Sequence, residues 1–157
     1  MQQPGTTPAS QLEQELAATR ELIDLLQREQ AQLIAADIEA LNGLTGLKAA
    51  VLERLASLAL QRHQRLAAAG FESSEAGMQA WVATQAPASP AGKTWRELRA
   101  LAPSAKELNR VNGLLIGQHL GRNQQAINTL RGGPAGGIYG PDGQTRVKSG
   151  GRSLVVG

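Results

Sequence analysis

The segment SQLEQELAATRELIDLLQREQAQLI, residues 10–34, determines the fold of this 157-residue chain. Its apolar side chains recur at alternating spacings of four and three, the period of one face of an α-helix. Ser10 and Glu13 have the spacing of a capping box, so a bundle helix is predicted over residues 10–36. The stripe consists of Leu12, Leu16, Thr19, Ile23, Leu26, Gln30 and Leu33, and is widened by Leu22, Leu25 and Ile34.

A second apolar stripe begins after Asp37, which is a fair N-cap for a helix over residues 38–69. The alternative is one unbroken helix over residues 10–69, about 90 Å long at ~1.5 Å per residue. A reversal near Asp37 is favoured because the two stripes can then face and bury each other. Gly70 suits the left-handed position after a helix, and Phe71 suits the apolar position that folds back on it. The second stripe consists of Ile38, Leu41, Leu44, Leu47, Val51, Leu55, Leu58 and Leu66.

Short helical pieces are predicted over residues 70–103. Ser74 caps one that runs to Gln85, residues 87–92 form a linker, and a capping box at Thr94 and Glu97 opens another that ends at Pro103. Trp81 and Trp95 fall in this region and are interpreted as core residues that close the bundle end against Phe71 rather than as exposed anchors.

A third capping box, Ser104 with Glu107, predicts a last long helix over residues 105–131. The fold class expected is therefore all-α: an elongated antiparallel bundle or coiled coil of three long helices, with short helices between the second and third. Residues 1–131 would form this domain, with 1–9 flexible, and the glycine-rich segment 132–157 would be a disordered tail. The last stripe consists of Leu108, Val111, Leu115, Leu120, Ile127 and Leu130.

Composition excludes some classes of function but does not by itself indicate one. The chain has no cysteine, no secretory leader and no long apolar run, so we expect a cytoplasmic protein without stable membrane insertion. Residues 1–53 hold eight acids and three bases, whereas residues 54–157 hold five acids and thirteen bases. The bases of the second half are spread at helical intervals with almost no aromatic residues, which favours a solvated helix face over nucleic-acid binding.

Catalysis and metal binding are not expected. His63 and His119 lie on different helices without a second ligand at metal-binding spacing, and no nucleophile motif or cofactor motif is present. Glu13, Glu29 and Glu53 are assigned to helix surfaces. His119 is instead interpreted, together with Asn112 and Asn123, as part of a buried polar seam that fixes the register of the last helix.

Gly113, Gly117 and Gly121 are spaced by four within the last helix, where each costs about 1 kcal/mol relative to alanine. Two interpretations are equally favoured: close packing against another helix of the bundle, or a shallow groove that receives a partner helix. Tyr139 is the sole tyrosine and lies in the tail. It suits an anchor for a transient partner, although composition alone also allows a stray aromatic or one folded back on the bundle.

The chain resembles the FlgN-type flagellar export chaperones over about residues 12–146, and residues 72–103 match least. The resemblance depends on the order of several weak motifs. They are Leu25-Leu-Gln-Arg-Glu29 with Leu33, Asp37-Ile-Glu-Ala-Leu41 running on to Lys48 and Leu52, Arg62 and Arg65 before Gly70-Phe71, Asn109-Arg-Val-Asn112 with Asn123, and Tyr139-Gly-Pro-Asp-Gly-Gln144.

This resemblance implies a cytoplasmic, helical chaperone without enzymatic activity. Its cargo would be the hook-associated proteins of the hook-filament junction, kept unpolymerised and brought to the flagellar type III export gate. Tyr139 would contact the cytosolic domain of the gate. The runner-up is a structural coiled-coil adaptor or self-assembling helical protein, and a weak homodimer is compatible with either. The implied cargo surface, which binds the C-terminal amphipathic helix of the cargo, consists of Val111, Leu114, Leu115, Leu120, Ile127 and Leu130.

Overall fold

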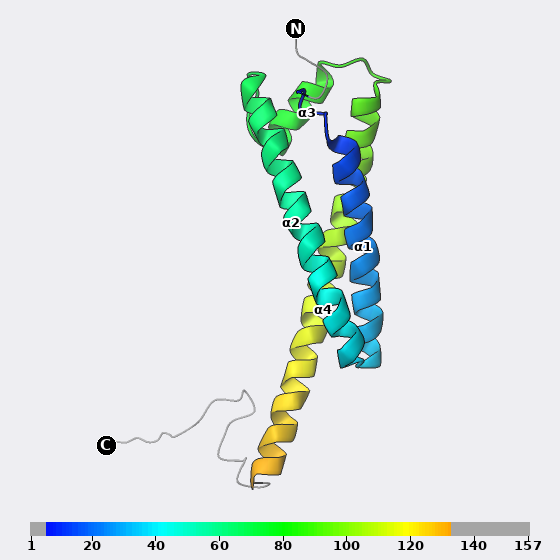
Figure 1. Ribbon diagram of the computed structural model, residues 1–157, viewed down its shortest axis with the longest axis vertical. Helices are drawn as coiled ribbons and strands as arrows, with labels where there is room; N and C mark the ends of the chain where they lie inside the picture. Colours follow the sequence, from blue (N-terminus) through cyan, green and yellow to red (C-terminus); the bar gives the residue numbers. More distant parts are fainter. Residues whose placement is uncertain (1–5, 133–157) are drawn as a thin grey trace, which may run out of the picture. The chain divides into compact units, whose positions relative to one another are not determined.

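The computed structural model describes residues 6–132, which form four α-helices and no strand (Figure 1). The predicted all-α class is confirmed for these residues. The tail 133–157 and residues 1–5 lie outside them. By its contacts the chain divides into two units, residues 1–115 and residues 116–157. The helices are α1, Leu12–Ala35; α2, Ile38–Ala68; α3, Glu75–Ala83; and α4, Pro90–Gly132.

The reversal predicted near Asp37 is confirmed. Ala36 adopts the left-handed conformation, with φ 56° and ψ 37°, and α1 therefore ends there. The Asp37 amide donates to the Gln32 carbonyl at 3.0 Å, and the Ala36 amide donates to that of Leu33 at 3.2 Å. These two bonds define a Schellman motif. Asp37 then caps α2, because its Oδ1 accepts from the Ala40 amide at 3.0 Å.

The predicted end of α2 is also confirmed. Gly70 has φ 87°, and the Phe71 amide donates to the Leu66 carbonyl at 2.8 Å, as in a second Schellman motif. Ser74 caps α3 as predicted, since its hydroxyl accepts from the Gly77 amide at 3.0 Å. The capping box at Ser10 was wrong. Its hydroxyl donates backwards to the Thr7 carbonyl at 2.8 Å, and α1 starts without a side-chain cap.

The boundaries predicted around the last helix were wrong. One helix runs through Pro103. It replaces the predicted linker over residues 87–92, the predicted short helix up to Pro103 and the predicted new start at Ser104. Its N-cap is Ser89, whose hydroxyl accepts from the Gly92 amide at 3.1 Å, with Pro90 in the first helical position. Thr94 lies inside α4, and its hydroxyl donates to Glu13 of α1 at 2.6 Å.

Polar pairs between helices define the directions of the elements within residues 1–115. Along α1 and α2 the partner numbers run in opposite senses, so these helices are antiparallel. Along α1 and α4 they rise together, so the first part of α4 is parallel to α1. The pairs of α1 with α2 are Glu15 with Arg62, Glu21 with Arg54, and Glu29 with Lys48; those of α1 with α4 are Glu13 with Thr94, Arg20 with Glu97, and Leu26 with Asn112.

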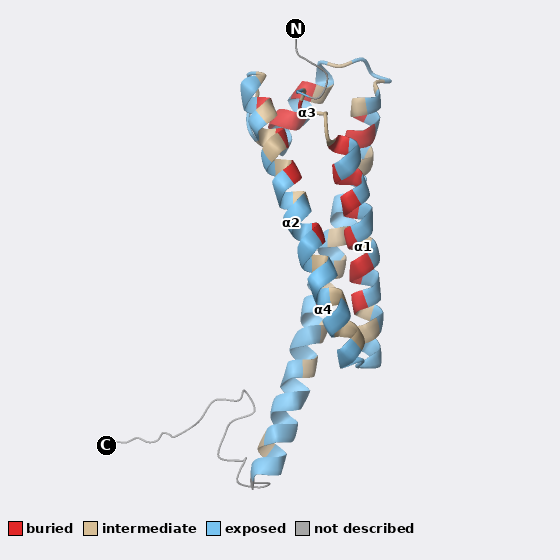
Figure 2. Cartoon of the chain, in the orientation of Figure 1, coloured by how far each residue is buried: buried red, intermediate tan, exposed pale blue. Residues whose placement is uncertain are grey.

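Buried apolar side chains of this unit form two clusters, whose residues are among those coloured as buried in Figure 2. The end cluster joins the start of α1, the end of α2, α3 and the start of α4, and it contains both tryptophans with Phe71 packed against it, as predicted. The middle cluster lies further along the bundle, with Ala105 and Leu108 of α4 packed on it. The end cluster is Leu12, Leu66, Met78, Trp81 and Trp95; the middle cluster is Ala18, Leu22, Leu25, Leu26 and Val51.

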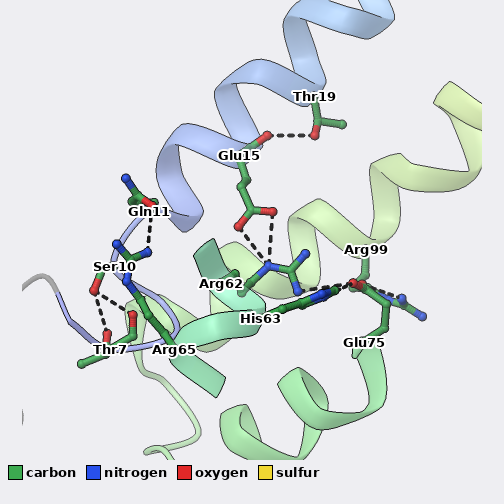
Figure 3. A network of polar contacts seen from close by, with 10 residues as sticks. All are labelled: Thr7, Ser10, Gln11, Glu15, Thr19, Arg62, His63, Arg65, Glu75 and Arg99. Carbon is green, nitrogen blue, oxygen red and sulfur yellow. Dashed lines mark hydrogen bonds and ion pairs between the residues drawn. The ribbon is translucent and has the colours of Figure 1, made fainter. Parts of the chain in front are cut away.

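A polar network crosses the end cluster and links all four helices (Figure 3). The Nε atom of Arg62 donates to both carboxylate oxygens of Glu15, at 3.2 and 3.0 Å, and both side chains are 5% exposed. Glu75 of α3 then accepts from Arg62 at 3.3 Å and from Arg99 of α4 at 3.2 Å. The Arg62 guanidinium also lies 5.0 Å from the centre of the Trp95 ring, within reach of a cation–π interaction.

Several apolar and acidic residues differ from their predicted positions. Glu29, assigned to the surface, is buried because Lys48 and Asn112 both donate to its carboxylate, at 2.7 and 2.8 Å. Ile34, Ile38 and Leu47, assigned to the stripes, are exposed at the α1–α2 turn or in the first half of α2. The apolar stripes of the sequence therefore continue up to the α1–α2 turn, whereas in the fold these three side chains near the turn are exposed.

Candidate partner-binding surface

The apolar residues predicted to bind a cargo lie on the last part of α4, and most of them are exposed. The exposed fractions are 58% for Leu114, 63% for Leu120, 46% for Ile127 and 87% for Leu130. The C-terminal part of α4, yellow to orange in Figure 1, is almost entirely exposed in Figure 2. Leaving large aliphatic side chains in water is costly, at roughly 25 cal/mol per Å² of apolar surface. Leu120, Ile127 and Leu130 lie on one face of the helix and therefore form an apolar strip available for contact, whereas Leu114 lies on another face.

Val111 and Leu115, which were predicted for the same surface, are partly buried. Ile116 is exposed and was missed, although its position in the heptad pattern gives the signal. Counting from Asn112, the spacing of four and three continues through Ile116, His119, Asn123, Ile127 and Leu130. The apolar period that faces the core up to Asn112 thus continues in the sequence of residues 116–132. None of the described side chains in that range is buried.

The three glycines of α4 face open space. A Cβ placed on Gly113, Gly117 or Gly121 would meet no atom within 4 Å. The interpretation that these glycines pack closely within the bundle is therefore wrong for Gly113, which lies in the same unit as α1 and α2. The other interpretation, a bare strip of helix backbone that a partner can approach, stays a prediction.

The predicted polar seam is confirmed at Asn112 and wrong at Asn123. The Asn112 amide nitrogen donates to the Leu26 carbonyl at 2.9 Å and to Glu29 at 2.8 Å, and the side chain is buried. Asn123 is exposed, and His119 is half-exposed. Asn112 thus fixes the register of α4 against α1 within residues 1–115, as a single polar position in a helical interface can.

Basic side chains flank the apolar strip. Residues 106–131 carry Lys106, Arg110, Arg122 and Arg131 but one acid, Glu107. Arg110 donates to Glu107 twice, at 3.0 and 2.6 Å. The hydrogen bond from Arg110 lowers the pKa of the Glu107 carboxyl, so this acid stays ionised and is compensated within the helix. The charge presented to a partner is therefore positive.

Neither a metal centre nor a membrane span is found among residues 6–132. No group of three or more histidine, aspartate and glutamate side chains there could hold a metal ion. None of the helices in this range combines the length and hydropathy needed to cross a bilayer. Tyr139, the predicted export-gate contact, lies outside the described residues.

Comparisons with known proteins place the chain in a family. A family model described as "FlgN protein" matches residues 6–146. The flagella synthesis protein FlgN of Proteus mirabilis is 29% identical over 148 residues, covering 93% of this chain and 91% of that protein. The flagella synthesis protein FlgN of Yersinia enterocolitica is 29% identical over 143 residues, covering 88% of each. No solved structure matches the chain. Because the family model spans most of its length, the chain belongs to the FlgN family of flagellar synthesis proteins.

Proposed function

We propose that this protein is a cytoplasmic export chaperone for flagellar hook-associated proteins. Three long helices act as the scaffold, and the apolar strip of α4 binds the C-terminal amphipathic helix of the cargo. The observation that carries the proposal is the exposure of Leu120, Ile127 and Leu130 on one face of a helix in a FlgN-family chain. An amphipathic helix laid on this strip would cover apolar surface that is otherwise in contact with water.

Masking the cargo helix explains how such a protein works without catalysis. A segment that assembles with neighbouring subunits cannot do so while its apolar face is covered. Affinity would be moderate, because ordering a glycine-weakened helix consumes part of the contact free energy. Moderate affinity also allows the cargo to be released at the type III export gate without a nucleotide bound to the chaperone.

Titration calorimetry with the C-terminal segment of a hook-associated protein tests the cargo site. Leu120→Asp and Ile127→Asp should each weaken binding at least about tenfold, since a buried anchor contributes more than about 1.4 kcal/mol. The matched control is Leu60→Asp, because Leu60 is 60% exposed on α2 and Leu120 is 63% exposed on α4. Equal binding by all four proteins would refute the site.

Docking at the export gate is assigned to Tyr139 and is tested separately. Tyr139→Ala should leave cargo binding unchanged and weaken the pull-down of the cytosolic domain of the gate. Loss of both contacts, or of neither, would contradict separate sites for the cargo and the export gate.

The alternative, a structural adaptor or self-assembling helical protein, uses the same strip for homodimerisation. The surplus of bases on residues 106–131 opposes pairing of two copies of α4, because like charges would face each other. Sedimentation of the pure protein at micromolar concentration distinguishes the two functions. A tight symmetric dimer that Leu120→Asp dissociates would favour the alternative, and at most weak self-association is expected.

A further inference from the structure

A hollow of about 230 Å³ opens between α1, α2 and α4, within residues 1–115. Its volume lies below the ~300–1,000 Å³ of typical small-molecule sites, so it suits one or two side chains of a docking protein rather than a cofactor. The hollow is lined by Leu22, Leu26, Lys48, Leu52, Ala105, Lys106 and Asn109.

The floor of the hollow is apolar and packed against buried side chains. Leu22 and Leu26 belong to the middle cluster, and Ala105 packs against it. Leu52 stands at the rim on α2, and 47% of its surface is exposed. An apolar side chain entering here would contact leucines that are already fixed, so little additional ordering opposes its binding.

The two lysines of the hollow differ in how far their charge is compensated. Lys48 donates to Glu29 at 2.7 Å, and Glu29 is held from the other side by Asn112. Among the described residues, the Lys106 ammonium has neither an ion pair nor a hydrogen bond. Its neighbour Glu107 is bound to Arg110 and does not neutralise it. Lys106 is therefore an uncompensated cation beside an apolar hollow.

We propose that this hollow is the anchor pocket of the partner-binding surface, occupied by one apolar side chain of an amphipathic helix whose neighbouring carboxylate pairs with Lys106. The inference rests on the proposed function and deepens it. It adds a contact site within residues 1–115, which includes Leu52 of α2, and it specifies an acidic partner helix.

Charge complementarity favours this occupant over the two others that the chain itself could provide. The chain's own tail carries Arg146, Lys148 and Arg152 against Asp142 alone. The α4 helix of a second copy would bring the basic segment 106–131. Both would place positive charge beside Lys106, which costs free energy, whereas a carboxylate gains it.

The test titrates the full-length chain with the C-terminal segment of a hook-associated protein. Leu52→Asp should weaken binding at least tenfold, and Asn109→Trp should do the same by filling the hollow from an exposed position. Lys106→Glu should weaken binding several-fold at low ionic strength and less at high ionic strength. Lys93→Glu, an exposed lysine of α4 outside the hollow, is the matched control and should change nothing.

The outcomes separate this inference from the function on which it rests. If Leu120→Asp abolishes binding while the Leu52, Asn109 and Lys106 variants bind normally, the pocket is refuted and the proposed function stands. If the segment does not bind the wild-type chain, both are refuted. If Leu52→Asp changes only the sedimentation of the pure protein, the occupant is a second copy and the inference is overturned. Equal far-UV circular dichroism of all variants excludes misfolding as the cause.

Discussion

Ala36 is the one described residue other than glycine with a positive φ, 56°. A left-handed conformation costs an L-residue with a Cβ roughly 1 kcal/mol, and glycine avoids that cost. Ala36→Gly should therefore raise the free energy of unfolding by about 0.5–1 kcal/mol, measured by urea denaturation. The control Ala17→Gly, at an exposed position inside α1, should lower it by about 1 kcal/mol. A loss of stability in both variants would contradict the turn geometry.

Two ion pairs between α1 and α2 differ in burial, and Arg62 of the buried pair also contacts Glu75 and Trp95. Glu15 and Arg62 are each 5% exposed, whereas Glu21 and Arg54 are about half-exposed. Removing one partner of a buried pair leaves an uncompensated charge, so Arg62→Met should cost about 3–5 kcal/mol. Arg54→Met should cost less than about 1 kcal/mol. Thermal unfolding of the two variants checks the difference, and equal losses would mean that Glu15 is not buried as described.

The burial of Glu15 and Glu29 could not be predicted from the sequence, because each is buried by a partner on another helix. Heptad position places both acids beside the apolar stripe, where an acidic residue normally faces water. Their partners Arg62 and Lys48 are 47 and 19 residues away in the chain. Asn112 was predicted correctly, since a polar residue at a seam position of a helix is itself the signal.

Helix ends were predicted correctly where the chain reverses and incorrectly where it continues. Asp37, Gly70 and Ser74 lie at real ends, and their caps form as expected. The boxes starting at Thr94 and Ser104 lie inside α4, since burial of Leu98 on one side of Pro103 and of Leu108 on the other holds the helix together. That burial outweighs the ~3 kcal/mol that proline costs in a helix interior. Ser89 followed by Pro90 was the available signal for the true start.

The glycines of α4 provide a prediction at the level of the element. Because a Cβ on Gly113, Gly117 or Gly121 would meet nothing within 4 Å, the triple alanine variant should stabilise the helix by about 1 kcal/mol per site. Its far-UV helical signal should rise. Binding of the cargo segment should fall if the partner backbone approaches these positions closely. Gly77→Ala is the opposite case, because its Cβ would collide with the Glu72 carbonyl and destabilise the protein.

At the scale of the whole molecule, the separation of charge along the sequence has a structural explanation. Acids of α1 pair with bases of α2, as in Glu15 with Arg62 and Glu21 with Arg54, so acids of the first half and bases of the second half compensate each other within residues 1–115. The bases beyond residue 115 lack this compensation in the sequence. The sequence shows that the basic residues are dispersed, but which acid pairs with which base could not be predicted without the fold.

The two units should also differ in local stability. Residues 12–112 supply both clusters, whereas none of the described side chains of residues 116–131 is buried. Amides in the middle of α1 should exchange only through global unfolding, and those of residues 116–132 should exchange at least about a thousandfold faster. Hydrogen exchange followed by mass spectrometry measures this. Adding the cargo segment should slow exchange in residues 116–132 and leave the amides of α3 unchanged. If residues 116–132 are already protected in the free protein, their apolar strip is not available and the proposed function is refuted.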